Sequence, residues 1–412
     1  MERIIVQKYG GTSVGSIDRI KHVAKQIVSV KNKGNKVVVV VSAMAKTTNS
    51  LIAKAKAINP DPSDRELDML LSTGEQISIS LLAMAIQSLD HKVVSLTGHQ
   101  CGIVTDTNHK KARITEINTD RISKELLEDK IVIVAGFQGV SKDNDITTLG
   151  RGGSDTTAVA IAAALKADQC EIYTDVDGIY TTDPRIVKNA RLLDKISYDE
   201  MLELASLGAK VLHSRSVELA RKFKIPLVVK SSFKQSKGTE VVEVNAVEKV
   251  SVRGVSLDKN IAKLSILEVP DQPGIAFKLF STLSKNNIQV DMIIQNINRD
   301  SVNDISFTVK QEDLQEAIKI SQNIVDEIGA KEVIYDEGVS KLSVVGTGIA
   351  GSAEVASTFF ESLYDLSVNI QMISTSEIKI SCIIDEQHGE KSLVYLHDQF
   401  SLGIDALENK AV

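Results

Sequence analysis

Short β-branched runs alternate with longer amphipathic stretches over the first 245 residues. The runs have strand length, and the stretches between them carry apolar residues at helical spacing. This alternation predicts an α/β domain in which helices cover both faces of a mainly parallel sheet. The expected strands are 3–8, 36–42, 92–97, 131–136, 170–175 and 226–231, and the expected helices are 17–31, 64–90, 154–166 and 213–224, with Ser16, Ser63 and Ser154 as candidate N-caps.

The last third of the chain repeats itself with an offset of about 80 residues. Each copy predicts the order strand, helix, strand, strand, helix, which favours a small α+β sandwich with both helices on one face of its sheet. An alternating run at 250–257 predicts one more strand. The matching segments are KLSIL (263–267) with KLSVV (341–345), IQVDMI (288–293) with VNIQMI (368–373), and ISFTV (305–309) with IKISC (378–382).

These patterns divide the chain into four parts. Residues 1–245 form the α/β domain, 263–335 the first repeat and 336–412 the second. The strand within 246–262 is either a connection or an additional strand of the second repeat, and the sequence leaves both assignments open. A length of 412 residues also predicts two or three domains, because a single hydrophobic core rarely grows that large.

Charge and hydropathy restrict the class of partner. The net charge is −6, and no block of Lys and Arg exceeds two residues, which argues against a nucleic-acid or anionic membrane surface. The apolar runs are far shorter than the roughly 20 residues of a membrane span. The N-terminus enters a strand without a signal-type apolar segment. We therefore expect a cytoplasmic protein that binds small molecules, with no nucleic acid and no membrane.

The cysteines and histidines indicate neither a disulfide framework nor a metal site. Cys101, Cys170 and Cys382 are far apart and form no CxxC pair, so we expect small buried thiols. The seven histidines show no HExxH or similar spacing. We therefore expect the functional groups of the site to be side chains other than Cys and His.

A glycine-rich turn, KYGGTSVGS at 8–16, joins the first strand to the first helix. Such a turn presents backbone N–H groups to a phosphate at a helix N-terminus. It is not a Walker A loop, because no Lys follows Gly15. Here Lys8 precedes the glycines and has the length to reach the β- and γ-phosphates. A surface lysine beside a tight turn is the structural alternative.

Two other motifs have competing interpretations. Residues 11–15 also satisfy GxSxG, the nucleophile elbow of serine hydrolases, but they follow the first strand, so no upstream loop supplies an oxyanion hole. Residues 346–351 satisfy GxGxxG, but no Asp or Glu ends the next strand to bind a ribose. We interpret the second motif as a tight loop of the repeat.

Further polar positions follow other strands. A second glycine-rich turn at 149–153 brings Arg151 to a helix that contains Ser154 and Asp155, which suits an anion. Asp155 either orients Lys8 or only complements the helix dipole. Ser42 at a strand end, Glu75 after a Ser-Thr-Gly turn inside a predicted helical region, and the loop at 172–187 also suit a ligand crevice, although each alone is more often structural.

In chain order, the segments KYGGTS, VSAM, STGEQ, GRGGSDTTA, YTDVDGIYTTDPR and GAKVLHSRSVELA resemble the aspartate kinase branch of the amino acid kinase family over residues 1–245. The repeated tail resembles the paired ferredoxin-like ACT domains of these kinases. The resemblance implies the amino acid kinase fold followed by two ACT domains. It also implies transfer of the ATP γ-phosphoryl group to the β-carboxylate of L-aspartate, giving 4-phospho-L-aspartate for lysine, threonine and methionine biosynthesis.

The resemblance also implies a role for each matching residue. Lys8 and Asp155 are the expected catalytic residues, with ATP and Mg²⁺ as cofactors and no protein ligand named for the metal. The expected ATP-binding residues are Lys8, Tyr9, Gly10, Gly11, Thr174, Asp175, Tyr180, Arg185 and Lys210, and the expected aspartate-binding residues are Ser42, Glu75, Arg151 and Ser154. Two departures, Ser214 in place of Pro and Lys230 in place of Arg, are expected to touch no ligand contact.

The ACT resemblance implies feedback control by an amino acid, lysine or threonine or both. A helix entry in the first repeat suits an effector carboxylate and ammonium, although a plain turn is the structural alternative. Assembly as a homodimer or a dimer of dimers through the tails is implied as well. A catalytically silent amino-acid sensor and a sister kinase for glutamate or acetylglutamate remain alternatives. The expected effector residues are Asp271, Gly274, Ala276, Gln295, Asn369 and Ile370.

Overall fold

The computed structural model describes residues 2–206, 211–243, 251–297, 302–349 and 351–404. Its internal contacts divide the chain into two compact units. The first unit contains residues 1–180, 192–206 and 210–245, and the second contains 181–191, 207–209 and 246–412. Lys210 lies outside the described residues.

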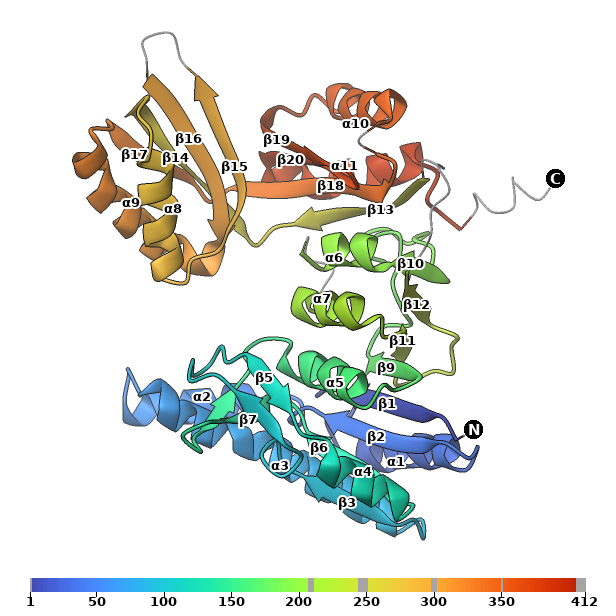
Figure 1. Ribbon diagram of the computed structural model, residues 1–412. Helices are drawn as coiled ribbons and strands as arrows, with labels where there is room; N and C mark the ends of the chain where they lie inside the picture. The colour runs from blue at the N-terminus through green and yellow to red at the C-terminus, as the bar shows by residue number, and fades with distance from the viewer. Residues whose placement is uncertain (1, 207–210, 244–250, 298–301, 350, 405–412) are drawn as a thin grey trace, which may run out of the picture. The chain divides into compact units, whose positions relative to one another are not determined.

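A large mixed sheet forms the centre of the first unit (Figure 1). Its strands are β1 (Ile4–Tyr9), β2 (Lys36–Val41), β3 (Val93–Leu96), β6 (Ile131–Ala135), β9 (Gln169–Thr174), β10 (Lys195–Ser197), β11 (Leu227–Ser231) and β12 (Thr239–Val242). Their order is β10-β12-β11-β9-β1-β2-β6-β3. The run from β11 to β3 is parallel, and β12 pairs antiparallel with β11. The expected mainly parallel sheet is confirmed.

Helices pack on both faces of this sheet, as expected. They are α1 (Ile17–Lys31), α2 (Thr47–Ile58), α3 (Asp64–Gln87), α4 (Asp120–Leu127), α5 (Gly153–Ala164), α6 (Tyr198–Ser206) and α7 (Ser214–Phe223). Alternate strand residues point to opposite faces. Tyr9, Val39 and Ile133 share one core with α1 and α3. Lys8 therefore points to the other face, where it meets α5.

The helix starts differ in part from the expected caps. Ser16 caps α1, and its hydroxyl accepts a hydrogen bond from Arg19 N. Ser63 is the N-cap of α3 but makes no side-chain cap bond. Ser154 is not a cap, because Gly152, in a left-handed conformation at φ 65°, already precedes the first residue of α5. The expected Ser-Thr-Gly turn before Glu75 is also wrong, since residues 72–74 lie inside α3.

Helix α3 is long and apolar enough to cross a membrane by length and composition alone. The expectation that no segment has this property came from continuous apolar runs, and it missed a helix in which polar residues interrupt the pattern. Half of its most apolar window is buried inside the protein, and its buried face includes Asp68 and Glu75. These are properties of a core helix in a folded α/β domain.

A second, smaller sheet of the first unit was not predicted. It consists of β4 (Ile103–Thr105), β5 (Ile114–Ile117), β7 (Gln138–Ser141) and β8 (Ile146–Thr148), in the order β5-β4-β7-β8. These strands have only three or four residues each, so their alternation is too short to register as a pattern.

The second unit contains both repeats as separate α+β layers (Figure 1). The first repeat comprises β14 (Ile261–Pro270), α8 (Ile275–Lys285), β15 (Val290–Ile297), β16 (Val302–Lys310), a 3-10 turn (Gln311–Asp313), α9 (Leu314–Ile328) and β17 (Glu332–Asp336). The second comprises β18 (Val339–Thr347), α10 (Ala353–Asp365), β19 (Ile370–Ser376), β20 (Lys379–Asp385) and α11 (Glu386–Gln399). Strand β13 (Ser251–Asp258) pairs with β18, so the extra strand belongs to the sheet of the second repeat.

Each repeat has its own core, and the two also pack together. In the first repeat, α8 and α9 bury Leu279, Leu283 and Ile324 against the sheet. A shared cluster then includes Met292 of β15 and Met372 of β19. An ion pair between Lys341 and Asp291 and a 2.5 Å hydrogen bond from Lys263 Nζ to Gln371 Oε1 connect the repeats.

The segment 181–191 belongs to the second unit although it follows the first unit's β9 in sequence. The carbonyl of Thr181 accepts a hydrogen bond from Val255 N at 2.8 Å, and its hydroxyl lies 3.0 Å from His397 Nε2. Ile404 N donates to Asn189 O at 3.0 Å. Val187 and Ala190 are buried. An antiparallel bridge between Tyr180 and Leu192 closes this segment, which is called the hairpin below, and the hairpin is integrated into the second repeat.

Candidate active site

The loops after four adjacent strands converge at the carboxyl edge of the main sheet. Gly10 N, after β1, donates to Tyr173 O of β9, and Ser42 N, after β2, donates to Tyr9 O. Gly136 N, after β6, donates to Val41 O. In open α/β sheets the ligand crevice lies at this edge. Most of the expected site residues lie on these loops or on α3 and α5 beside them.

Lys8 and Asp155 form an ion pair at this edge, with 2.6 Å between Lys8 Nζ and Asp155 Oδ1. Both side chains are nearly buried, at 12% and 11% exposure. The expected proximity of the two residues is therefore present. A paired carboxylate directs the ammonium and leaves its other protons for an anion, which is what a phosphate-binding lysine requires.

The glycine-rich turn packs tightly against the loop after β2. A Cβ on Gly11 would lie 2.6 Å from Ala43 O, and Ala45 N donates to Gly11 O at 2.9 Å. A Cβ on Gly10 would lie 3.6 Å from Lys8 Nζ. The backbone of the turn therefore lies next to the lysine, with only Gly fitting at position 11.

Glu75 connects α3 to the loop that contains Ser42. Its Oε1 accepts a hydrogen bond from Ala43 N at 3.0 Å, while its buried Oε2 has no hydrogen-bond partner within the part of the chain that the structure describes. The side chain is 3% exposed. Burial raises the pKa of Glu75 to about 7, although the hydrogen bond from Ala43 opposes this shift. An unpaired carboxylate oxygen beside a ligand crevice suits a ligand ammonium group.

Arg151 is exposed at the tip of the turn that precedes α5. Ser154, in the first turn of α5, packs against the end of β6, where a Cβ on Gly136 would lie 2.7 Å from Ser154 Oγ. Gly152 has a positive φ, and a Cβ there would lie 2.2 Å from His213 Cβ. The neighbours of Ser214 pack against this turn, because Arg215 Nη1 donates to Leu149 O at 2.9 Å and His213 lies against Gly152, and the expectation that Ser214 touches no ligand stays a prediction.

The expected nucleotide residues divide between the two units. Thr174 ends β9, and its hydroxyl donates to Asp175 at 3.2 Å. Tyr180 donates a 3.4 Å hydrogen bond to Asp177, and burial raises its pKa. Arg185 forms a 2.6 Å ion pair with Asp183, within the hairpin that belongs to the second unit.

Ser232, which the sequence did not single out, contacts two of the loops expected to form the site. Its hydroxyl donates to Thr174 O at 3.0 Å and accepts from Ser13 Oγ at 2.9 Å, and the side chain is fully buried. It therefore connects the glycine-rich turn to the nucleotide loop. No local pattern could reveal this, because Ser13 and Ser232 are 219 residues apart.

A buried polar network lies under the site on the opposite face of the sheet. Glu171 accepts hydrogen bonds from Gln7 at 2.8 Å, Tyr173 at 3.0 Å and Lys230 at 2.7 Å. Tyr173 stacks on Tyr9, with ring centroids 4.6 Å apart, and burial raises the pKa of both phenols. Lys230 therefore contributes to the packing beneath the expected phosphate site, although it lies on the face away from Lys8.

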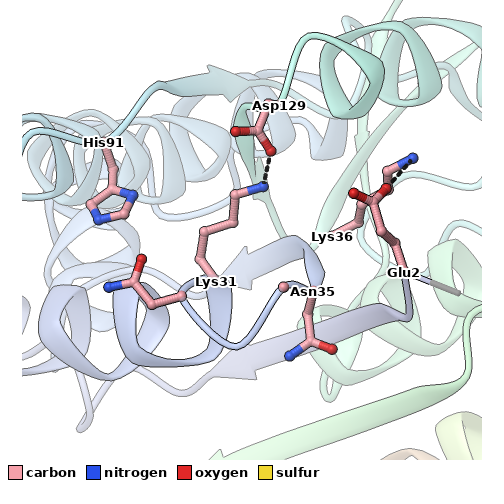
Figure 2. Close-up of a pocket in the computed structure, with 8 residues that line it drawn as sticks. Glu2, Lys31, Asn35, Lys36, His91 and Asp129 are labelled. Carbon is pink, nitrogen blue, oxygen red and sulfur yellow. Dashed lines mark hydrogen bonds and ion pairs between the residues drawn. The ribbon is translucent and has the colours of Figure 1, made fainter.

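A polar pocket of about 260 Å³ lies at the other edge of the sheet (Figure 2). It contains the ion pairs Lys31–Asp129 and Lys36–Glu2, at 2.5 and 3.2 Å, together with His91. None of the expected site residues lines it. Its charges neutralise one another at the amino ends of the strands, away from the converging loops.

The expected effector residues are mostly exposed on the second unit. Gly274 is the N-cap of α8 with φ 96°, and Ala276 lies in the first turn of that helix. Asp271 accepts a hydrogen bond from the buried Asn303 at 3.1 Å. Gln295 lies on β15, while Ile370 is the first residue of β19 and Asn369 directly precedes it. Strands β15 and β19 also contribute Met292 and Met372 to the cluster between the repeats.

All three cysteines are buried thiols, as expected. Burial raises the pKa of Cys101 and Cys382 to about 12 and raises that of Cys170 as well. Among the residues that the structure describes, no group of three or more His, Cys, Asp or Glu side chains gathers as a metal site.

Family models agree with this architecture. A model of the amino acid kinase family matches residues 3–231, and a model of the ACT domain matches residues 267–322 and 342–400. The chain therefore belongs to the amino acid kinase family, carries ACT domains and is an ATP-dependent kinase.

Within this family, the chain is similar to individual proteins named aspartate kinase or aspartokinase. The aspartate kinase of Pseudomonas putida is 51% identical over 409 residues, which cover 99% of this chain and 100% of that protein. The structure of E. coli aspartokinase III in complex with aspartate and ADP (R-state) is 26% identical, with a TM-score of 0.82 over 96% of this chain and 99% of that one. The complex of the same enzyme with lysine and aspartate (T-state) has a TM-score of 0.73, with the same identity and coverage.

Proposed function

We propose that this kinase transfers the γ-phosphoryl group of ATP to the β-carboxylate of L-aspartate, giving ADP and 4-phospho-L-aspartate. The observation that supports this acceptor most directly is Glu75, whose buried, unpaired Oε2 lies next to the loop of Ser42. Such an oxygen suits the ammonium of an amino acid. The relatives named as aspartate kinases over the full length support the same acceptor.

In the proposed complex, the two ends of the amino acid are bound separately. Glu75 pairs with the ammonium, and Arg151 binds the α-carboxylate as a fork, with Ser42 and Ser154 beside them. The β-carboxylate is then left free to attack. Fixing both ends aligns the nucleophile with the phosphoryl group, and alignment is a large part of the catalysis of such a transfer.

Lys8 and the amides of Gly10 and Gly11 are proposed to hold the transferring phosphate, with Asp155 orienting Lys8. One β-carboxylate oxygen attacks the γ-phosphorus while the bond to the bridging oxygen of ADP breaks, so no covalent enzyme intermediate is needed. Mg²⁺ bound to the phosphate oxygens would supply further positive charge. Tyr9, Thr174, Asp175, Tyr180, Arg185 and Lys210 are proposed to surround the nucleotide.

The second unit is proposed to bind a regulatory amino acid, lysine or threonine, at Asp271 and Gly274. The entry of α8 presents N–H groups to a carboxylate, and Asp271 is available for an ammonium. The E. coli relative solved with lysine supports this class of ligand. Strand β17 is a sheet edge with exposed Ile334 and Tyr335, which favours assembly into a homodimer or dimer of dimers. A cytoplasmic location completes the proposal.

The test is ATP-dependent formation of an acyl phosphate, trapped with hydroxylamine, with L-aspartate, L-glutamate and N-acetylglutamate as separate acceptors. We expect hydroxamate from aspartate alone, and less of it when lysine or threonine is added. Turnover with another acceptor would identify a sister kinase. No turnover in a folded, ATP-binding preparation would favour an amino-acid sensor.

A further inference from the structure

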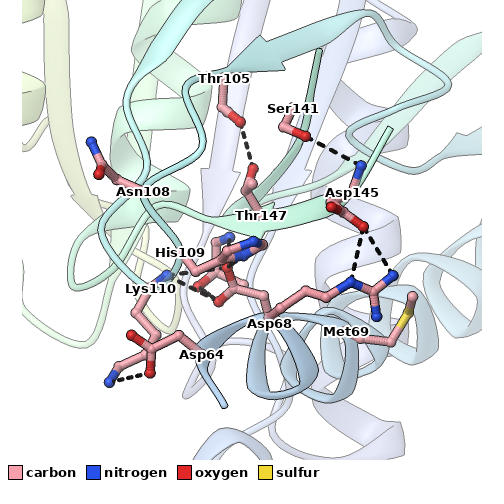
Figure 3. A network of polar contacts seen from close by, with 12 residues as sticks. Asp64, Asp68, Met69, Thr105, Asn108, His109, Lys110, Ser141, Asp145 and Thr147 are labelled. Carbon is pink, nitrogen blue, oxygen red and sulfur yellow. Dashed lines mark hydrogen bonds and ion pairs between the residues drawn. The ribbon is translucent and has the colours of Figure 1, made fainter. Parts of the chain in front are cut away.

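A single buried carboxylate, Asp68 on α3, holds two separate segments of the domain (Figure 3). Its oxygens lie 2.8 Å from His109 Nδ1 and accept hydrogen bonds from Lys110 N at 3.1 and 3.2 Å. They also accept from Thr148 N at 3.0 Å and from Thr148 Oγ1 at 2.5 Å. Asp68 is completely buried, so these bonds replace its lost hydration.

Arg215 of α7 holds the same two segments from another direction. Its Nη1 donates to Leu149 O at 2.9 Å, and its Nη2 donates to Ala112 O at 2.8 Å. Ala112 N in turn donates to Thr148 O at 3.0 Å, which joins the segments directly. Thr148 and Leu149 are therefore fixed by side chains from α3 and α7.

These two residues lead directly into the turn that presents Arg151. We propose that Asp68 and Arg215 are positioning residues, which fix this turn so that Arg151 meets the α-carboxylate of aspartate in one orientation. The inference rests on the proposed function, because it takes aspartate as the ligand of Arg151.

The physical reason is that Arg151 is exposed and has a long, flexible side chain. A guanidinium binds a carboxylate as a fork only over a narrow range of orientations, so the backbone that carries it must be rigid. The hydrogen bonds of Asp68 and Arg215 constrain that backbone without contacting the ligand. Neither residue lies on the glycine-rich turn at 8–16 or on the nucleotide loop. Their substitution should therefore weaken the binding of aspartate and not that of ATP.

The test compares Asp68→Asn and Arg215→Lys with the wild-type full-length chain by steady-state kinetics in the hydroxamate assay. Asp68→Asn keeps the size of the side chain but removes one carboxylate acceptor, and Arg215→Lys keeps the positive charge but removes the guanidinium fork. We expect the KM for aspartate to rise about tenfold or more, because a buried group is left without its partner. We expect the KM for ATP to change by less than about twofold, since the nucleotide loops keep their contacts.

Matched controls lie on the same helices. Asp64→Asn on α3 removes an exposed ion pair with Lys110 Nζ at 2.8 Å, and Arg221→Lys on α7 alters an exposed pair with Asp199 at 2.9 Å. Both controls should leave both KM values unchanged. In the double variant of Asp68 and Arg215, the fold-rise in the KM for aspartate should be smaller than the product of the rises in the two single variants, because both residues hold the same turn.

Thermal unfolding of each variant separates positioning from general destabilisation. Arg215 lines a groove of about 610 Å³, so a shorter cation there is accessible to water and the Lys variant is expected to fold. A lower Tm with an unchanged KM for aspartate, or equal rises in both KM values, would overturn the inference. If the wild-type chain fails to use aspartate, the proposed function fails instead, and the two failures are therefore distinguishable.

Discussion

At the scale of single residues, Glu75 shows how the fold changes the chemistry of a side chain. Its pKa is about 7 because α3 buries it, and one hydrogen bond from Ala43 N only partly offsets the loss of hydration. Near neutral pH the carboxyl group is therefore shared between its neutral and ionised forms. Only the ionised form pairs with an ammonium group, so binding of an amino acid and release of a proton are coupled.

We therefore expect the KM for aspartate to rise below pH 7, by up to about tenfold per pH unit, as Glu75 becomes protonated. The KM for ATP should not follow this titration. Glu75→Gln should bind aspartate weakly at every pH, with no inflection near 7. Steady-state kinetics from pH 5.5 to about 8.5 provides the measurement. An inflection that persists in the Gln variant would assign the titration to another group.

The same shift predicts a pH-dependent stability of the unligated protein. The pKa of Glu75 is higher in the folded chain than the ordinary value of 4.5. Folding therefore favours the protonated form, and the resulting stability is complete below pH 4.5 and lost as the pH rises to about 7. Above pH 7 the ionised carboxylate costs about 3 kcal/mol. Glu75→Gln should therefore raise the Tm at pH 8 but not at pH 5. An equal change in Tm at both pH values would show that ionisation of Glu75 is not the cause.

Lys8 has a matched control in Lys31, the last residue of α1. Lys31 has the same 12% exposure and also pairs with an aspartate, but its ion pair lies in the pocket at the amino edge. Lys8→Ala should lower kcat by ~10³-fold or more, because the developing charge on the phosphoryl group loses its main protein cation. Lys31→Ala should keep kcat within about twofold. The kcat of each variant is measured by hydroxamate formation. A similar fall in kcat in both variants would mean that the loss of Lys8 acts by destabilising the fold rather than by removing a phosphate contact.

The sequence predicted Lys8 and Asp155 because each sits in a local pattern, a glycine-rich turn beside a strand or a helix start. It did not predict Asp68 as a site residue, since its partner Thr148 is 80 residues away. The spacing of seven from Glu75 places both carboxylates on the same face of α3, and this was the available signal. Ser154 was assigned as a cap because Ser is common there, but the left-handed Gly152 made that cap unnecessary.

At the scale of elements, the sequence predicted the strands of the main sheet but not those of the small sheet. Strands such as β2 and β6 are continuous apolar runs buried on both faces, a strong signal for parallel strands. The strands of the small sheet are too short to show alternation. Their position depends instead on contacts between elements, including the hydrogen bonds that Asp68 accepts from β8.

Ser232, at the end of β11, tests whether contacts between elements shape the nucleotide site. Ser232→Ala removes the link between Ser13 and Thr174, and we expect the KM for ATP to rise about fivefold, with the KM for aspartate unchanged. Ser80→Ala, on the exposed side of α3, is the control, because its hydroxyl bonds only to its own helix. A rise in the KM for aspartate alone would contradict the expectation that Ser232 acts on the nucleotide loop.

At the scale of the whole molecule, the two units are not divided at a single point of the sequence. The repeats were predicted from their internal similarity, but the hairpin 181–191 was not separated from its flanks, since no sequence pattern shows which unit buries it. The structure assigns it to the second unit through Thr181 and Asn189.

This arrangement predicts the behaviour of a truncated chain. A fragment of residues 1–245 should expose Val187 and Ala190, which the full chain buries, and should therefore aggregate or unfold at a lower temperature. Adding residues 246–412 as a separate chain should restore solubility. Val187→Asp in the full chain should lower the Tm in the same direction, because it buries an unpaired charge. A fragment as soluble and as heat-stable as the full chain would contradict the assignment.

The hairpin also restricts how such kinases can be recombined. A chimera that joins this kinase unit to the tail of a relative at residue 245 keeps the hairpin of one parent against the repeat of the other. The pairs Thr181 with His397 and Asn189 with Ile404 would then come from different proteins. Exchanging residues 181–191 together with the tail, as one discontinuous module, keeps these contacts native and transplants the regulatory unit intact.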